Sequence, residues 1–272
     1  MDVETYIRRI GYTGPLAPSA ETLVALHTAH TLSVVFENLD IHLGREISLE
    51  TEAIYDKIVV RGRGGYCFEL NGLFAWLLES LGFSVMHLAA RVLDGTVVRP
   101  RSHRVLLVTV SGHRWIADVG FGGNGLIAPI PLSADRVDEQ YAERFRLIHM
   151  REHEYRLEYA IQDRWEALYR VALDPQLPVD YVYANYFHSH SPDSIFTQRR
   201  LCTRPTMEGR AVLQDRRLKV RVRSQTHTHT IETVDEYRGT LKERFGLSLS
   251  DDEAEACFAG GSALAACPRH PG

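Results

Sequence analysis

Apolar residues recur every three or four positions in the first third of the chain, which is the spacing of one helix face. The broadest such stripe lies within residues 68–81 and comprises Phe68, Leu70, Leu73, Phe74, Leu77, Leu78 and Leu81. Gly82 follows it, and glycine is common where a helix ends. Shorter helices are predicted from Asp2 or Glu4 to about Ile10, from an N-cap at Ser19 to His30, and from Glu50 to Val60.

After Gly82 the apolar period changes to two, which is the period of a half-buried strand. Strands are predicted over residues 85–93, 104–110, 114–119, 145–148, 155–161 and 165–169. Ser111-Gly112 has the composition of a two-residue hairpin turn. We expect this part to be a small antiparallel barrel or sandwich. Beyond about Asn185, a passage rich in Pro, Ser and Asn leads to strands over 211–213 and 218–223 and a helix over 235–245.

The composition is that of an ordered protein: of 272 residues, 44% are hydrophobic and 24% are charged. This length is enough for two or three compact units that share a core. The formal net charge of −4 argues against a general nucleic-acid binder, because no strongly positive field surrounds the chain. The start lacks a secretory signal pattern, and no stretch reaches the roughly 18 to 20 apolar residues that cross a bilayer. We therefore expect a cytoplasmic protein with no nucleic-acid or membrane partner.

The four cysteines, at positions 67, 202, 257 and 267, are scattered and form no Cys-x-x-Cys pair. This spacing disfavours a zinc ribbon or a disulfide framework. His227 and His229 would share one face of a strand, but an ordinary strand is a better interpretation of this stretch than a metal site. Free thiols and no bound metal are the expectation.

Cys67 stands directly behind Gly64-Gly65 and Tyr66, at the mouth of the apolar helix. A helix amino terminus favours a thiolate through its partial positive charge and unpaired N–H groups. The two glycines would leave room for another molecule beside the backbone. The alternative is that Cys67 is a small buried apolar residue, as free cysteines often are. This stretch alone leaves both open.

A thiolate enzyme also needs a base and a group that orients it, and the hairpin RSHRVLLVTVSGHRWIADVGFG offers both. A two-residue turn would pair Val110 with His113, so that His103 lies opposite Gly120, with Asp118 as its diagonal neighbour on the same face. A three-residue loop with a bulge would break this relation. Asp118 stands among apolar neighbours and would need a partner there, although it could instead be a turn aspartate. A Cys67–His103–Asp118 set is the better interpretation.

Several blocks of the sequence together resemble the arylamine N-acetyltransferases over about residues 6–249. They are FENLDIHLG, RGGYCFE, ADVGFGG and NYFHSHSPDSIFT, with the His103 strand in the expected place. The resemblance implies an α+β fold with a cysteine-protease-like catalytic core. It implies a helical bundle at 1–83, an antiparallel β-barrel at 84–190 and an α/β lid at 191–272. It also implies Cys67, His103 and Asp118 as the catalytic triad, with acetyl-CoA as donor. Small departures from the family's blocks, such as Leu70 and Ser102, bear on acceptor preference.

Further binding residues follow from the glycine-rich loop GFGGNG at 120–125 and from the same resemblance. Glycines let backbone N–H groups approach a pantetheine arm or phosphates, although a plain turn is an equal alternative. Phe121 and Gly122 are the leading candidates for CoA contacts, followed by Ser102 and Phe196. Phe36 is expected to line the acceptor pocket or to belong to the core. The resemblance also suggests an ion pair between Glu37 and Arg63, and the alternating cations at 216–223 are expected to be a solvated strand face.

The predicted reaction is ping-pong transfer of an acetyl group from acetyl-CoA to an arylamine or arylhydrazine nitrogen, through an acetyl thioester on Cys67. The expected partners are the amine and the CoA thioester, and the chain is expected to act as a monomer or a homodimer. One alternative is an amide synthase that closes macrolactam rings with the same triad. A cysteine peptidase, a transglutaminase-like enzyme and a non-catalytic binding domain are less favoured.

Overall fold

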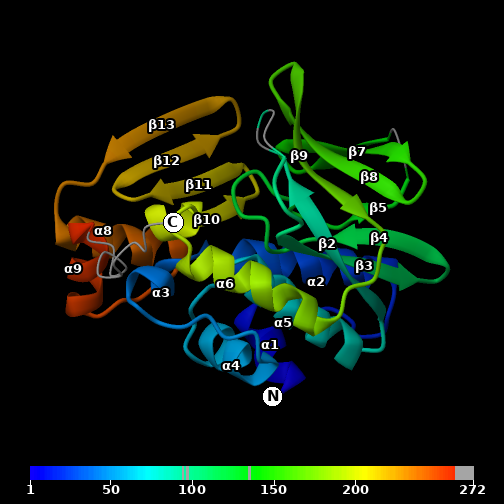
Figure 1. Ribbon diagram of the computed structural model, residues 1–272, viewed down its shortest axis with the longest axis horizontal. Helices are drawn as coiled ribbons and strands as arrows, with labels where there is room; N and C mark the ends of the chain where they lie inside the picture. Colours follow the sequence, from blue (N-terminus) through cyan, green and yellow to red (C-terminus); the bar gives the residue numbers. More distant parts are fainter. Residues whose placement is uncertain (94, 96–97, 134–135, 261–272) are drawn as a thin grey trace, which may run out of the picture.

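The computed structural model describes residues 1–93, 95, 98–133 and 136–260 (Figure 1). The amino-terminal part is helical, with α1 (Val3–Arg9), α2 (Ala20–Ser33), α3 (Leu39–His42), α4 (Thr51–Tyr55), a π-helical turn (Asp56–Val60) and α5 (Cys67–Ser80). The predicted N-cap at Ser19 is confirmed, since its hydroxyl accepts a hydrogen bond from the Thr22 N–H at 3.1 Å. The longest helices, α2 and α5, have 14 residues each, and within the described chain no helix is long and apolar enough to cross a membrane.

The middle of the chain forms an eight-stranded antiparallel sheet that curls into a nearly closed barrel. Its spatial order is β5-β4-β3-β2-β9-β8-β7-β6. The strands are β2 (Ser84–Val92), β3 (His103–Val110), β4 (His113–Ala117), β5 (Ile130–Pro131), β6 (Val137–Gln140), β7 (Glu143–Arg151), β8 (Glu154–Ile161) and β9 (Arg164–Ala172). The Gln140 side chain on one edge strand hydrogen-bonds backbone atoms of Ile127 and Ala128, just before the other edge strand, at 2.9 Å. Of the two predicted forms, the barrel is therefore the one observed.

A second, five-stranded antiparallel sheet has the order β1-β10-β11-β12-β13. Its strands are β1 (Phe36–Glu37), β10 (Leu201–Thr206), β11 (Gly209–Gln214), β12 (Arg217–Val222) and β13 (Gln225–Thr230). Apolar side chains of this sheet pack against α8 (Val234–Thr240), a π-helical turn (Leu241–Phe245) and α9 (Asp251–Ala259). Strand β1 comes from the helical part of the chain, so the first segment contributes to the carboxy-terminal sheet. The division into domains at residues 83 and 190 stays a prediction.

The helices that the sequence did not predict are α3, α9 and a stretch that lies between the two sheets in the chain. A 3₁₀ turn (Pro178–Tyr181) leads into α6 (Val182–His190), and α7 (Ile195–Gln198) follows. Tyr183 is 86% exposed and Tyr186 65%, so α6 lacks the apolar stripe by which a helix is usually recognised. Its side chains are held instead by hydrogen bonds to other segments, among them that from the Asn185 side chain to the Ile47 carbonyl at 2.9 Å.

Candidate active site

Cys67 is the first residue of α5, and the sequence before it explains why the helix begins there. The Tyr66 N–H donates to the Glu69 carboxylate at 3.0 Å, and the Tyr66 carbonyl accepts the first bonds of the helix. A β-carbon on Gly64 would lie 2.1 Å from the Val35 carbonyl oxygen. A β-carbon on Gly65 would lie 2.8 Å from the Glu69 carboxylate. The expectation that these glycines leave room for a ligand is therefore wrong: protein atoms fill that space.

The β3–β4 hairpin has the predicted register. Val110 pairs with His113 across a two-residue turn, and the ladder ends at Leu106 and Ala117. Ser111 and Gly112 both have positive φ, as a type I′ turn requires. Beyond the ladder, His103 Nε2 lies 2.7 Å from the Asp118 carboxylate, and both side chains are buried. The hairpin alone thus brings together the base and the acid proposed to orient it.

The Asp118 carboxylate accepts hydrogen bonds from three groups. In addition to His103, its Oδ1 accepts hydrogen bonds from the Asn71 amide at 2.9 Å and from the Gly120 N–H at 3.0 Å. Burial by itself raises the pKa of the Asp118 carboxyl, but the His103 cation and these donors outweigh it and hold the pKa below its usual range. Asp118 is therefore an anion in the folded protein.

His103 responds in the opposite direction. Burial lowers the pKa of its imidazole, but the Asp118 charge and the neighbouring Cys67 side chain outweigh burial and raise the pKa to about 10. Because Nε2 is bound to Asp118, Nδ1 is the ring nitrogen left to meet the sulfur. The Asp118 carboxylate therefore stabilises the imidazolium form of His103, beside the thiol that lines the same cavity.

Gly120 allows the Asp118 segment to approach the start of α5. A β-carbon on Gly120 would lie 2.9 Å from the Cys67 Cα and 2.8 Å from the Asn71 side chain. Any larger residue would have to push these two segments apart. From the sequence, Gly120 was expected opposite His103 and at the start of the glycine-rich loop, whereas Asn71, four residues after Cys67, was not identified.

His27 on α2 is a further buried support that the sequence did not indicate. Its Nε2 accepts the Asp118 N–H at 3.0 Å, and its Nδ1 lies 3.0 Å from the Ile127 carbonyl oxygen. Only a neutral imidazole can make both bonds, and burial lowers the pKa of His27 to about 4, which keeps it neutral. With thirteen histidines in the chain, no local signal distinguished this one.

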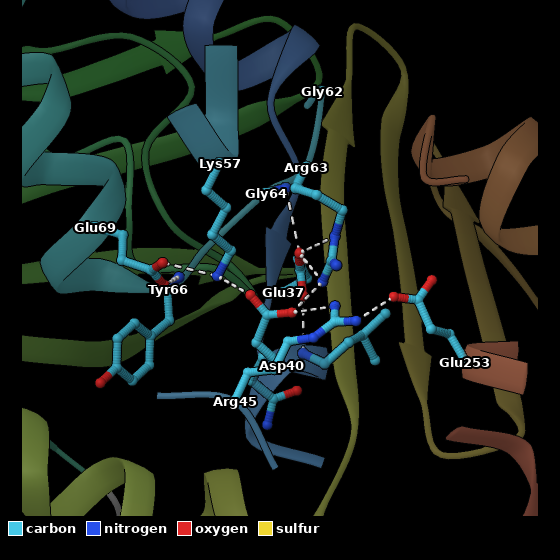
Figure 2. Close-up of polar contacts among 12 residues, drawn as sticks. Glu37, Asp40, Arg45, Lys57, Gly62, Arg63, Gly64, Tyr66, Glu69 and Glu253 are labelled. Atoms are coloured by element: carbon cyan, nitrogen blue, oxygen red, sulfur yellow. Dashed lines mark hydrogen bonds and ion pairs between the residues drawn. The ribbon is translucent and has the colours of Figure 1, made fainter. Parts of the chain in front are cut away.

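A buried network of charges lies beneath the start of α5 (Figure 2). Lys57 binds Glu69 at 2.7 Å and Asp40 at 2.8 Å. Arg63 binds Glu37 at 2.8 Å and Asp40 at 3.1 Å, so the suggested Glu37–Arg63 pair is present. Since Glu69 also caps α5 at Tyr66, its pairing with Lys57 fixes the helix end that carries the thiol.

The thiol and His103 line one cavity of about 480 Å³. Of the eight site residues predicted from the sequence, six line this cavity: Phe36, Cys67, Ser102, His103, Phe121 and Phe196. The ring of Phe121 meets that of His103 edge-on at 5.2 Å between centroids. The other lining residues are mostly apolar, which suits an aromatic molecule beside a reactive sulfur.

The structure does not place the other two predicted residues on this wall. Asp118 lies behind His103. Gly122 lies against Phe36, so that a β-carbon there would be 2.8 Å from the Phe36 ring. Gly122 has φ +69° and lines a separate small space of about 20 Å³. Whether its N–H contacts CoA stays a prediction.

A second, open cleft of about 830 Å³ lies between the barrel and the carboxy-terminal sheet. Lys219, Arg221 and Arg223 border it from the second sheet, and Arg144 borders it from β7. The predicted solvated face of β12 therefore faces a cleft with several positive groups. Asn124 also lines it, and because Phe121 is three residues away, their Cα atoms are at most about 11 Å apart.

The other described cysteines differ from Cys67 in their surroundings. Cys202 and Cys257 are buried in the core of the carboxy-terminal sheet, and burial raises the pKa of both thiols, that of Cys257 to about 11. The described cysteines are free thiols. Across the described ranges no group of three or more His, Cys, Asp or Glu side chains could hold a metal. His229, one of the two histidines considered for a metal site, instead binds Glu236 at 2.5 Å. Cys67 is the described thiol that lines the 480 Å³ cavity.

The chain is similar to known proteins over most of its length. A family model described as N-acetyltransferase matches residues 19–254. The arylamine N-acetyltransferase of Escherichia coli strain K12 is 37% identical over 253 residues, which cover 90% of this chain and 89% of the relative.

Solved structures agree with the sequence relatives. The arylamine N-acetyltransferase of Salmonella typhimurium superposes with a TM-score of 0.89 at 33% identity, covering 94% of this chain and 97% of that one. The Mycobacterium marinum arylamine N-acetyltransferase in complex with CoA superposes with a TM-score of 0.88 at 33% identity, covering 94% and 98%.

Proposed function

Because the chain belongs to the arylamine N-acetyltransferase family, we propose that Cys67, His103 and Asp118 carry an acetyl group from acetyl-CoA to the nitrogen of an arylamine or arylhydrazine. The observation that supports this best is the buried 2.7 Å contact between His103 and Asp118 beside a cavity that Cys67 also lines. A thiol, a base and an oriented carboxylate at one apolar cavity are the parts that acyl transfer through sulfur requires.

In the first half-reaction, Cys67 donates its proton to His103, and the thiolate attacks the carbonyl carbon of acetyl-CoA. Asp118 stabilises the imidazolium that forms. The bond between the acetyl carbon and the CoA sulfur breaks, and the leaving thiolate takes the proton from His103. N–H groups in the first turn of α5 have no acceptors within the helix and are available to the developing oxyanion.

In the second half-reaction, the amine nitrogen attacks the acetyl carbon of the Cys67 thioester. His103 accepts the proton that the nitrogen loses, and the Cys67 thiolate leaves. Arylamines and arylhydrazines suit this step because they are largely unprotonated near neutral pH, whereas simple aliphatic amines are cationic and poor nucleophiles. Two alternating enzyme forms predict ping-pong kinetics.

The two cavities suggest where each substrate binds. The acceptor ring fits the apolar wall that includes Phe36, while Ser102, Phe121 and Phe196 stay the proposed CoA contacts in the same cavity. Gly122 stays in the proposal as a backbone contact. The cleft bordered by Lys219 and Arg221 carries positive charge that suits the phosphates of CoA. The loop from Phe121 to Asn124 connects the cavity at Cys67 with this cleft.

Finer features of the prediction also belong to this proposal. A thiol at a helix start that faces a histidine on a barrel strand is consistent with the predicted cysteine-protease-like core. The proposed catalytic residues all come from one chain, so a monomer would suffice for the chemistry, and a homodimer would need no shared site. A cytoplasmic location suits a reaction that depends on a free thiol.

The test measures release of free CoA from acetyl-CoA, with and without phenylhydrazine, by wild type, Cys67→Ala and the buried-thiol control Cys202→Ala. Acceptor-dependent release that is lost only in Cys67→Ala, with acetyl trapped on the Cys67 peptide when the acceptor is omitted, is the expected result. Sequential kinetics, or full activity in Cys67→Ala, would contradict the mechanism. Peptide hydrolysis without any CoA dependence would favour a peptidase.

A further inference from the structure

His188 lies in the wall of the 480 Å³ cavity, on α6, in the stretch where the sequence analysis expected irregular structure. It belongs neither to the proposed triad nor to the predicted binding residues. Its ring contacts three aromatic side chains: Phe196 at 5.1 Å, Phe187 at 5.7 Å and Phe68 at 6.0 Å between centroids.

The hydrogen bond of His188 defines its protonation. Nε2 lies 3.1 Å from the carbonyl oxygen of Ser102, which can only accept, so Nε2 carries the hydrogen. Burial first, and the charges of His103 and Arg99 next, lower the pKa of His188 to about 4. The ring is therefore neutral in the working pH range, and Nδ1 is a bare acceptor. Among the described residues Nδ1 has no hydrogen-bond partner.

This pattern is hard to explain by packing alone. A buried acceptor without a partner lowers stability, and a phenylalanine would fill the same aromatic pocket without that cost. Unlike phenylalanine, histidine can donate a hydrogen bond from Nε2–H to the Ser102 carbonyl. That carbonyl belongs to the residue immediately before His103.

Two contacts of His188, with the Phe68 ring and with the Ser102 carbonyl, involve the chain neighbours of both reacting groups. Phe68 follows Cys67 directly, and Ser102 precedes His103 directly. On the other side of Cys67, the Tyr66 hydroxyl donates to the side-chain oxygen of Asn185, one turn earlier on α6. Helix α6 therefore braces the thiol-bearing helix and the histidine-bearing strand at the same time.

We infer that His188 is a positioning residue for the acetyl transfer, which sets the relation of the Cys67 sulfur to the His103 ring by tying Ser102 to α6 against Phe68. The inference rests on the proposed function for its role in turnover. The geometry of the Cys67–His103 pair can nevertheless be tested without any acetyl transfer.

The experiment compares wild type with His188→Gln and His188→Met. Glutamine and methionine have similar length and shape, but only glutamine can donate to the Ser102 carbonyl. The matched control is His190→Phe, on the same helix, whose ring stacks on Tyr186 outside the cavity lining. Thermal unfolding checks that each variant folds.

Two readouts are recorded for each variant. One is the rate of Cys67 alkylation by iodoacetamide as a function of pH, followed on the Cys67 peptide by mass spectrometry. The other is kcat and KM for acetyl-CoA and phenylhydrazine. In His188→Met we expect kcat to fall roughly tenfold, the size of one lost neutral hydrogen bond, with little change in either KM. The pH of half-maximal alkylation should rise, because a displaced imidazolium stabilises the thiolate less.

His188→Gln should recover most of kcat and the wild-type alkylation profile, and His190→Phe should match wild type. An unchanged alkylation profile and kcat in His188→Met would overturn the inference, as would equal losses in the Gln and Met variants. Failure of the proposed function and failure of the positioning role would give different results. A wild-type enzyme that forms no acetyl-Cys67 refutes the proposed function, whereas a shifted alkylation profile in His188→Met would still support the positioning role.

Discussion

Replacing Asp118 by asparagine is the sharpest perturbation of the site, because it changes charge and hydrogen-bond direction while keeping the shape. The asparagine oxygen can still accept from Asn71 and Gly120, as Oδ1 of Asp118 does. Its NH₂ group would then face His103 Nε2, which must become the acceptor. The ring proton would move to Nδ1, the nitrogen left to meet Cys67. His103 could then no longer take the thiol proton.

The shift in the pKa of His103 gives the expected size of the loss in activity. The pKa of His103 is about 10 beside Asp118, against an ordinary 6.5. At about 1.4 kcal/mol per pH unit this difference corresponds to about 5 kcal/mol of preference for the imidazolium. Without the carboxylate only burial and the thiol remain, and burial lowers the pKa of the ring. We expect kcat/KM to fall about a thousandfold, which is the rate equivalent of about 4 kcal/mol.

The assay is acetyl transfer to phenylhydrazine between pH 6 and 9, together with the pH dependence of Cys67 alkylation. Asp174→Asn is the matched control, since that carboxylate pairs with Arg101 on the surface, where the two side chains are 59% and 46% exposed. It should change the rate less than twofold. Retention of more than a tenth of wild-type kcat/KM by Asp118→Asn would refute the reasoning, because a correct tautomer would then be unnecessary.

Three further perturbations test the surroundings of the site. Gly120→Ala should lower both activity and the free energy of unfolding, the latter by about 1–3 kcal/mol, because its β-carbon would lie 2.9 Å from the Cys67 Cα. Lys57→Met should lower the free energy of unfolding in urea by about 3–5 kcal/mol, because it leaves the buried Glu69 carboxylate without a counter-ion, whereas Asp40 keeps Arg63. For His27, the folded pKa of about 4 lies below the unfolded 6.5, so the unfolded chain binds more protons. Stability should therefore fall from pH 6.5 toward 4, and His27→Gln should make that fall shallower.

Matched variants separate these effects from general damage. Gly239→Ala should be harmless, since no atom lies within 4 Å of its β-carbon position. Arg61→Ala removes a surface pair with Asp56 and should cost about 0.5 kcal/mol or less. A Gly120→Ala protein as active and stable as wild type, or Lys57→Met no worse than Arg61→Ala, would contradict the packing arguments. For His27→Gln, an acid-stability slope identical to wild type would be the contrary result.

Local sequence signals accounted for much of the fold and for the contact between His103 and Asp118. The apolar stripe after Cys67 predicted α5, and the glycine after it marked the end. The Ser111-Gly112 turn predicted the register that puts His103 and Asp118 together. These predictions hold because helix period and turn chemistry act between residues close in the chain, so long-range packing had no need to override them.

Helix α6 shows where such signals fail. Its outward residues include exposed tyrosines, so the apolar period is absent, and Asn185 and His188 hold it through bonds to segments about 90 to 140 residues away. The prediction that Gly64 and Gly65 leave room for a ligand was wrong for a different reason. A glycine pair has the same sequence signature whether a ligand or another part of the protein approaches it.

The sequence by itself determined helix α5, the β3–β4 hairpin with its register and the reactive residue types, because each depends on neighbours a few positions apart. Tertiary structure alone decided which other groups surround them: His27 and Asn71 at the carboxylate, the charges under α5, and α6 closing the cavity wall. The physical reason is that a buried polar group is satisfied by whichever partner packing brings within about 3 Å, and no local pattern encodes a partner that lies tens of residues away.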